Sequence, residues 1–321
     1  MAVPVSLEII GEAARRIQGI VRRTPLLDAS ERTNFRLMLK CENFQVTGSF
    51  KIRGAYNLVA QLAEDFPASG VITYSSGNHA QAVAYAARRL GLFAVVVMPE
   101  TAPVIKVDGA RSYGAEVLFE GTTSDARRIR AESEARSRGL HMVPPFDHQA
   151  IIAGQATVGI EVLEELPDVE GIYVPVGGGG LISGVAAAVK QSQPSVRVVG
   201  VEPVGSAAMH ASLVRGEVVT LDQTQSVADG LLPVRPGELT FAHVSSLVDD
   251  IVVVDDEAIC AAVSWLASSA KLVVEPSGAV SVAAALASES SSSEENKIVA
   301  VLSGGNISPR SFASFFMNGP K

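Results

Sequence analysis

The sequence predicts an α/β protein built around parallel sheets. Short runs of β-branched residues alternate with longer helical patterns, and this order favours parallel strands covered by helices on both faces. Of the 321 residues, 47% are hydrophobic but only 5% are aromatic, so the core must consist mainly of Ala, Val, Leu and Ile. The length suits two lobes, or one large α/β domain with an insertion.

The first half of the chain predicts three strands that alternate with three helices. We expect the strands at residues 71–74, 93–98 and 116–119, and the helices at the ranges that follow them, 78–90, 102–113 and 124–138. Gly91 ends the first of these helices, as glycine commonly does. Three strand–helix pairs in succession are typical of a parallel sheet.

The second half repeats this style. We expect strands at residues 171–176, 196–201 and 297–302, a glycine loop at 177–180 and a helix at 181–190. Residues 288–295 read Ser-Glu-Ser-Ser-Ser-Ser-Glu-Glu, which predicts an exposed surface loop. No stretch resembles a flexible linker, so the two lobes are expected to share an interface.

Composition excludes several classes of function. The net charge of −8 argues against a nucleic-acid surface, which would need a basic patch. No apolar stretch approaches the ~20 residues that span a bilayer, and the N-terminus lacks the pattern of a signal peptide. Cys41 and Cys260 are too few for a disulfide scaffold, and two free thiols suit a reducing compartment. We therefore expect a cytoplasmic enzyme with neither nucleic-acid nor membrane partners.

The glycine run Gly177–Gly180 predicts a phosphate site. It follows a predicted strand and opens a predicted helix, so backbone N–H groups and the positive end of the helix dipole can face an anion. No Gly-Lys-Ser/Thr follows, so it is not a Walker loop. Ser183 stands where a dinucleotide fingerprint would have its last glycine. The alternative is a tight turn packed against a neighbour.

Three further segments carry polar residues at expected element ends. Lys51 lies just inside a helix start, where a positive environment lowers the pKa of an amine; alone, it would pass for a surface lysine. Ser75-Ser76-Gly77-Asn78-His79 suits a carboxylate or an ordinary helix cap. His79 by itself is more typical of a packed structural histidine. Ser303-Gly304-Gly305-Asn306 alone indicates a turn.

Together these segments resemble the fold type II enzymes that use pyridoxal 5′-phosphate (PLP), and among them the serine/threonine dehydratases and serine racemases. The resemblance covers nearly the whole chain. Its motifs, in order, are Ser49-Phe50-Lys51-Ile52-Arg53-Gly54-Ala55, Ser75-Ser76-Gly77-Asn78-His79-Ala80-Gln81, Pro175-Val176-Gly177-Gly178-Gly179-Gly180-Leu181, Ala228-Asp229-Gly230, Glu275-Pro276-Ser277-Gly278-Ala279 and Ser303-Gly304-Gly305-Asn306.

The resemblance implies a tryptophan synthase β-like fold with two open parallel-sheet α/β domains. Residues 1–69 and 148–321 would form the large PLP-binding domain, and residues 70–147 a small domain that binds the substrate carboxylate. It also implies a homodimer. The implied roles are cofactor attachment and Cα base for Lys51, ring packing for Phe50, the 3′-oxygen for Asn78, the pyridine nitrogen for Ser303, the phosphate for Gly177, Gly178, Gly179, Gly180 and Leu181, and the carboxylate for Ser75, Ser76, Gly77 and His79.

The residue at the pyridine nitrogen favours one reaction type. The hydroxyl of Ser303 is neutral and cannot hold the nitrogen protonated as a carboxylate would, so the ring is a weaker electron sink. This suits β-elimination and works against transamination. We therefore expect a dehydratase that converts L-serine, L-threonine or another L-β-hydroxy amino acid to a 2-oxo acid and ammonia. The side-chain pocket is expected near residues 231–236, with Arg235 in a surface salt bridge rather than reading a substrate carboxylate.

Two alternatives stay open. In the family, serine racemases carry serine where this chain has Ser76, which could protonate the Cα face opposite Lys51. The segment Arg235-Pro236-Gly237-Glu238-Leu239-Thr240 instead resembles the threonine dehydratases. A ligand sensor without turnover is the second alternative, although Lys51, Ser76 and Ser303 are all present.

Two absences are also expected. Metal-binding relatives use a glutamate, matched here by Glu202, and an aspartate, where this chain has Ala208. Losing a carboxylate weakens a hard-cation site, so we expect no metal and no strong divalent dependence. Fifteen residues follow Asn306, too few for the C-terminal effector domain of the biosynthetic threonine dehydratases. We therefore expect no isoleucine inhibition and nearly hyperbolic kinetics.

Overall fold

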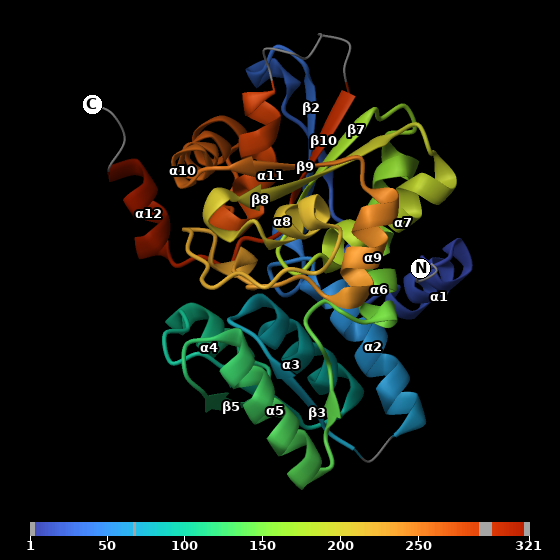
Figure 1. The fold of residues 1–321 in the computed structure, drawn as a ribbon, viewed down its shortest axis with the longest axis vertical. Coiled ribbons are helices and arrows are strands. Elements are labelled where there is room, and N and C mark those ends of the chain that lie inside the picture. The colour runs from blue at the N-terminus through green and yellow to red at the C-terminus, as the bar shows by residue number, and fades with distance from the viewer. Residues whose placement is uncertain (1–3, 67–68, 289–296, 318–321) are drawn as a thin grey trace.

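The computed structural model describes residues 4–66, 69–288 and 297–317. Within these ranges the strands form one six-stranded and one four-stranded sheet. Figure 1 shows the four-stranded sheet and its helices in the lower part of the view, and the larger sheet above them. We call residues 71–142 the small lobe and the other described residues the large lobe.

The small lobe contains a fully parallel sheet in the order β5-β4-β3-β6. Alternate residues of its strands face opposite layers: Val96 packs with α3, whereas Val95 packs with Ala131 of α5. The elements are β3 (Val71–Tyr74), α3 (Asn78–Leu90), β4 (Ala94–Met98), α4 (Val104–Ser112), β5 (Glu116–Phe119), α5 (Ser124–Arg138) and β6 (His141–Met142).

The large lobe has the sheet order β1-β2-β10-β7-β8-β9. All neighbours are parallel except β1, a short edge strand that pairs antiparallel with β2. No strand was predicted from the sequence at β1, which has only three residues, nor at β2 or β9. The strands are β1 (Leu26–Asp28), β2 (Arg36–Cys41), β7 (Gly171–Pro175), β8 (Arg197–Pro203), β9 (Asp250–Val254) and β10 (Lys297–Leu302).

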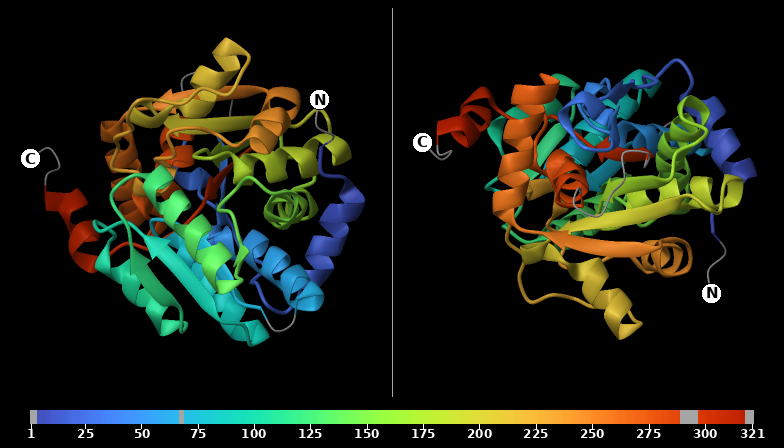
Figure 2. Two further views of the ribbon diagram at one scale, coloured as in Figure 1. Left: turned by 60° about the horizontal axis from the view of Figure 1, so that its bottom comes forward. Right: turned by 90° about the horizontal axis from the view of Figure 1, so that it is seen from above.

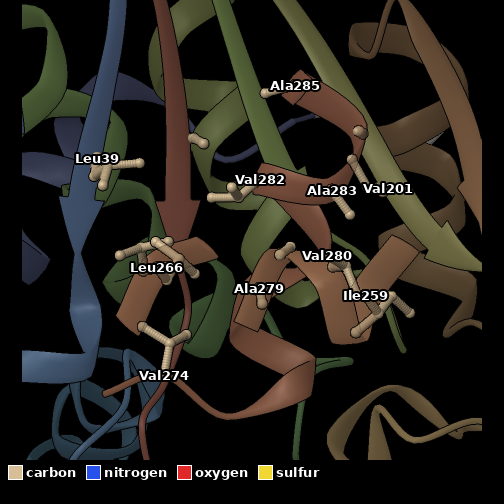
Figure 3. Close-up of a cluster of buried hydrophobic side chains, with 14 of the residues drawn as sticks. Leu39, Val201, Ile259, Leu266, Val274, Ala279, Val280, Val282, Ala283 and Ala285 are labelled. Atoms are coloured by element: carbon tan, nitrogen blue, oxygen red, sulfur yellow. The ribbon is translucent and has the colours of Figure 1, made fainter. Parts of the chain in front are cut away.

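Helices cover both faces of this larger sheet. Leu302 of β10 belongs to the apolar cluster under α10 and α11, part of which Figure 3 shows, whereas Val301 faces α6 and α7. The helices are α1 (Leu7–Ile17), α2 (Lys51–Asp65), α6 (Gln149–Glu165), α7 (Gly180–Ser192), α8 (Ala208–Arg215), α9 (Glu238–Leu247), α10 (Asp256–Trp265), α11 (Pro276–Ala287) and α12 (Pro309–Met317).

Glycines bring α6 close to its neighbours, and this contact positions the start of α2. A Cβ on Gly154 of α6 would lie 2.5 Å from the Cα of Gly54 in α2. A Cβ on Gly184 of α7 would lie 2.5 Å from the backbone nitrogen of Ala156 in α6. The left view of Figure 2 shows α6 (green, seen end-on) between α7, α1 and α2. Lys51 therefore begins a helix that is held by direct backbone packing.

The structure confirms the predicted α/β order and shifts some element ends. β3, α3, β5, α5 and β10 have the predicted bounds, whereas α4 begins at Val104 because Pro103 is its N-cap. The helix predicted from residue 181 begins one residue earlier, inside the glycine run. Most of the Ser-rich stretch, from residue 289, lies outside the described residues. No helix in the described ranges is long and apolar enough to cross a membrane.

Candidate active site

The motif segments meet at the carboxyl ends of the strands. Parallel α/β sheets bind ligands at this edge, because the loops after neighbouring strands converge there. The loop before α2 pairs with the segment after β10: the Phe50 N–H donates to the Ser303 carbonyl at 3.1 Å, and Ser49 bridges to Gly304. Asn306 reaches the small lobe, because its Nδ2 donates to Asn78 Oδ1 at 2.8 Å.

Lys51 is the first residue of α2 and carries a desolvated amine. Its Nζ donates to the Pro145 carbonyl at 2.8 Å and lies 5.2 Å from the centre of the Phe50 ring. Burial lowers the pKa of Lys51 to about 8. A lysine with this pKa is neutral in a useful fraction of molecules near neutral pH, so it can act as a nucleophile towards an aldehyde and as a base.

The glycine run forms the N-terminus of α7, which has no side-chain cap. Gly179 has a φ of 94°, and a Cβ on Gly178 would lie 2.3 Å from the Phe146 ring. The loop is therefore possible only with residues that lack a side chain. Because the first N–H groups of a helix have no partner within the helix, this terminus is suited to a phosphate.

Residues 145–147 connect the lysine to the glycine run. Pro145 accepts the hydrogen bond from Lys51, and Phe146 lies against Gly178. Asp147 holds this segment in place: its Oδ1 accepts from the N–H of Leu239 at 2.9 Å and from that of Thr240, so it caps α9. The sequence analysis missed these residues, and no pattern in the sequence marks them.

Asn78 is held between the two lobes by polar contacts. It begins α3, its Nδ2 donates to the carboxylate of Glu275, and its Oδ1 accepts from Asn306. Glu275 is buried, and a Cβ on Gly304 would lie 2.3 Å from its Oε1. The amide of Asn78 is thereby fixed with its N–H side towards Glu275, beside the segment that contains Ser303.

The segment before α3 forms a tight bend. Ser75 Oγ accepts from the Gly77 N–H at 3.1 Å, and Ser76 is half-buried next to it. The His79 ring is turned into the protein, with Nε2 at 3.1 Å from the Val143 carbonyl. Burial and the charge of Lys51 lower the pKa of His79 to about 3, so this ring is neutral. The backbone N–H groups at this helix start remain suited to a carboxylate.

Ser303 and Leu181 are placed so that each could bind a ligand through one group only. Ser303 is buried and its Oγ donates to the Ser277 carbonyl at 3.2 Å, so its hydroxyl must turn to donate to a ligand. The Leu181 side chain packs in the core under the sheet, which leaves only its backbone for a phosphate. Arg235 confirms the predicted surface salt bridge, at 2.5 Å from Glu238.

Lys106 was also missed by the sequence analysis. It lies on α4 of the small lobe and is buried, yet its Nζ is 2.7 Å from Asp229 Oδ2 and 3.1 Å from Glu275 Oε2 in the large lobe. A lone lysine in a helix gives no signal in the sequence. Glu275 and Asp229 do lie in motifs of the resemblance, but without an assigned role.

Glu202 accepts hydrogen bonds from the start of α8. Its oxygens accept from the N–H groups of Met209 at 2.9 Å and His210 at 2.8 Å, at the start of α8. Burial raises its pKa to about 7. Among the described residues there is no cluster of three His, Cys, Asp or Glu side chains that could hold a metal ion. The expected absence of a metal dependence stays a prediction.

These residues fit PLP. The uncapped α7 terminus suits its phosphate, the desolvated amine of Lys51 suits its aldehyde, and Asn78 and Ser303 supply polar groups on segments bonded to the loop before Lys51. Two buried polar atoms of the site, Ser49 Oγ and His79 Nδ1, have no hydrogen-bond partner in the described part of the chain. Such atoms are rare in proteins and are typical of ligand sites.

Comparison with known proteins identifies the family of the chain. Residues 17–304 match the family described as pyridoxal-phosphate dependent enzymes. An L-threonine ammonia-lyase of Geobacter sulfurreducens is 44% identical over 308 residues, which cover 95% of this chain and 76% of that protein. A serine racemase of Oryza sativa subsp. indica is 43% identical over 93% of this chain and 90% of that protein. The structure of maize serine racemase superposes with a TM-score of 0.92 and 38% identity, covering 98% of both chains.

The fold and the match together define a PLP-dependent enzyme of fold type II. The chain belongs to the family of pyridoxal-phosphate dependent enzymes, and it is similar both to threonine ammonia-lyases and to serine racemases.

Proposed function

We propose that this chain is an ammonia-lyase that eliminates water from L-threonine or L-serine and yields a 2-oxo acid and ammonia. The observation that carries the proposal is Lys51, an amine whose pKa is lowered to about 8 and which donates to Pro145, the residue before the Phe146 that packs on the glycine loop. The similarity to threonine ammonia-lyases over 95% of the chain supports this choice. The substrate range within β-hydroxy amino acids follows from the side-chain pocket, which we place near residues 231–236.

The residues proposed to hold PLP come from three loops. Gly177–Gly180 and the backbone of Leu181 would bind the phosphate, Phe50 would pack on the ring, Asn78 would donate to the 3′-oxygen and Ser303 would face the pyridine nitrogen. When bound, PLP supplies stabilisation of negative charge at the substrate Cα. The neutral hydroxyl of Ser303 limits that stabilisation, which favours elimination over transamination.

In the reaction, this chain orients the amino acid and moves one proton. The α3 N-terminus with Ser75, Ser76, Gly77 and the backbone of His79 would hold the substrate carboxylate. The amine of Lys51 would take the Cα proton, and its lowered pKa suits a base that works near neutral pH. One proton is returned to the β-hydroxyl, which leaves as water, and the resulting enamine takes up water to give the 2-oxo acid and ammonia.

The test is release of 2-oxo acid from a panel of L-β-hydroxy amino acids with the PLP-loaded protein. We expect turnover of threonine, serine or both, and none by Lys51→Ala with its fold retained. Lys190→Ala is the control, because Lys190 lies in the last turn of α7, at the end opposite the glycine run, and pairs with Asp249. Wild-type turnover by Lys51→Ala, or no turnover of any β-hydroxy amino acid, would contradict the proposal.

Serine racemisation is the second candidate, and Ser76 is the observation that favours it. The Ser76 hydroxyl lies in the bend before α3, where it could protonate the Cα face opposite Lys51, and a serine racemase is 43% identical to this chain. Measuring D-serine and pyruvate together from L-serine separates the two activities. If racemisation occurs, Ser76→Ala should suppress D-serine more than pyruvate; equal loss of both would assign Ser76 to binding alone.

Several further properties complete the proposal. We propose that residues 70–147 act as the substrate-carboxylate domain and the remainder as the PLP domain, with a homodimer as the working unit. The exposed apolar side chains of Phe44 and Val273 support a subunit interface, and light scattering tests it. Two unpaired cysteines support a cytoplasmic location. Activity should persist after chelation of divalent metals.

A further inference from the structure

We propose that Lys106 is a positioning residue that connects the two lobes at the cofactor site and, through Glu275, holds Asn78 in place. This inference rests on the proposed function of the site. Lys106 would touch neither the cofactor nor the substrate, so its effect passes through its neighbours.

The first step is the location of Lys106. Its ammonium lies 2.7 Å from Asp229 Oδ2 and 3.1 Å from Glu275 Oε2, and the side chain is only 3% exposed. Burial alone would lower the pKa of Lys106, but the charges of Glu275 and Asp229 outweigh burial and raise it. Lys106 is therefore a permanent cation that a small-lobe helix inserts between two acids of the large lobe.

The second step is the effect on Glu275. Burial and Asp229 raise the pKa of this carboxyl group, and Lys106, 3.1 Å away, opposes that rise without cancelling it. Removing the Lys106 charge therefore raises the pKa of Glu275 further and favours its protonated form. Without the Lys106 charge, Glu275 would therefore present an O–H group instead of accepting only.

The third step leads to Asn78. Asn306 Nδ2 donates to the Thr47 carbonyl at 2.9 Å and to Asn78 Oδ1 at 2.8 Å, so Asn78 must turn its Nδ2 towards Glu275. The hydrogen bonds thus run in one direction, from Asn306 through Asn78 to Glu275, whose ionised form the Lys106 ammonium favours. Protonating the last acceptor weakens the series, because a charged acceptor binds an N–H about twice as strongly as a neutral one.

The stem of Lys106 has a separate contact. A Cβ on Gly77 would lie 2.2 Å from Lys106 Cδ, so the methylene groups pack directly on the bend proposed for the substrate carboxylate. Charge and stem can therefore be tested separately. Lys106→Met keeps most of the stem and removes the charge, whereas Lys106→Ala removes both.

The experiment measures the dissociation constant of PLP by visible absorbance as a function of pH, together with kcat and KM for the preferred substrate. We expect Lys106→Met to weaken PLP binding about tenfold and to lower kcat, with KM nearly unchanged. Lys106→Ala should also raise KM, and Lys106→Arg should restore PLP affinity in part. Lys190→Met is the control, because Lys190 forms an ion pair of the same length, 2.7 Å, with Asp249 away from the site.

Glu275→Gln distinguishes this role from simple support of the fold. Glu275→Gln removes the carboxylate through which Lys106 acts, so adding Lys106→Met should change PLP affinity little further. The part of the pH dependence of PLP affinity that comes from ionisation of Glu275 should also vanish. The inference fails if Lys106→Met and Lys190→Met bind PLP equally well, or if the Lys106 and Glu275 effects are additive. If Lys106→Met does not fold, wild-type PLP affinity and pH profile in Glu275→Gln would overturn it. Failure of wild type to bind PLP would instead refute the proposed function.

Discussion

Replacing Arg53 with Met should destabilise the fold strongly, because the buried carboxylate of Glu42 loses its directly bonded cation and keeps only the Thr24 hydroxyl as a side-chain donor in the described residues. Arg53 and Glu42 are both 0% exposed. The guanidinium donates through Nε and Nη2 to the two oxygens of Glu42, each at 2.8 Å, and also to Glu161. Glu161 keeps a second cation, Lys40, at 2.8 Å, so the damage falls on Glu42.

The magnitude follows from those two bonds. Each hydrogen bond to a charged group contributes about 1.5–3 kcal/mol, which gives about 3–6 kcal/mol for the pair. Breaking a buried ion pair from one side typically costs about 3–5 kcal/mol, so the two figures agree. Arg130→Met is the matched control, since Arg130 pairs with Glu134 at 3.0 Å on the exposed side of α5. That change should cost less than about 1 kcal/mol.

The assay is urea unfolding followed by circular dichroism at several pH values. Burial alone would raise the pKa of Glu42, but Arg53 outweighs burial and lowers it, so this carboxylate stabilises wild type above the unfolded pKa and less as the pH falls. Without Arg53 the pKa of Glu42 in the folded protein rises, and its protonation removes the cost of a buried unpaired charge. The difference in unfolding free energy between wild type and Arg53→Met should therefore decrease from pH 8 to pH 5. A loss below about 1 kcal/mol at pH 8, or a gap that widens in acid, would refute the reasoning.

Three further predictions concern other groups of the site and its supports. Asp147→Ala removes the cap of α9, so it should lower the free energy of unfolding by about 1 kcal/mol and weaken PLP binding. Asp147→Asn should have smaller effects on both quantities. Equal PLP affinity in wild type and both variants would contradict the role given to residues 145–147. The rate of PLP attachment should rise with pH through an inflection near 8, the pKa of Lys51, in stopped-flow absorbance, and an inflection near 10.5 would show an unperturbed lysine. Burial raises the pKa of Glu202 to about 7, so its contribution to stability is present at low pH and is lost as the pH rises from about 4.3 to 7. The free energy of unfolding of Glu202→Gln should lack this decrease with pH. If the decrease is unchanged in the variant, Glu202 is not its source.

Local signals account for the parts of the fold that the sequence predicts correctly. α3 ends at Gly91 and α5 at Gly139, both in the left-handed conformation, and Thr123 caps α5 through its side chain. The start of α4 was predicted two residues too early, because Ala102 and Pro103 were counted in the helix although Pro103 is its N-cap. β1 was missed since three residues carry too little periodicity to predict a strand.

For the site, the sequence predicts segments better than side-chain directions. Lys51, Asn78 and Ser303 follow from motif and element order, and the structure brings their segments together. The inward turn of the His79 ring depends on the Val143 carbonyl, 64 residues away. Lys106 depends on Asp229, which is 123 residues away in the chain. Such pairings arise from tertiary packing, so no local pattern could reveal them.

The central claim is that Lys51 is the amine that holds PLP. Incubating the wild-type protein with PLP, reducing it with borohydride and mapping the modified peptide by mass spectrometry tests this most directly. We expect one phosphopyridoxyl group per chain on Lys51, and none at this position in Lys51→Ala. A label on another lysine, such as Lys106, or no stable label on the wild-type protein, would contradict it.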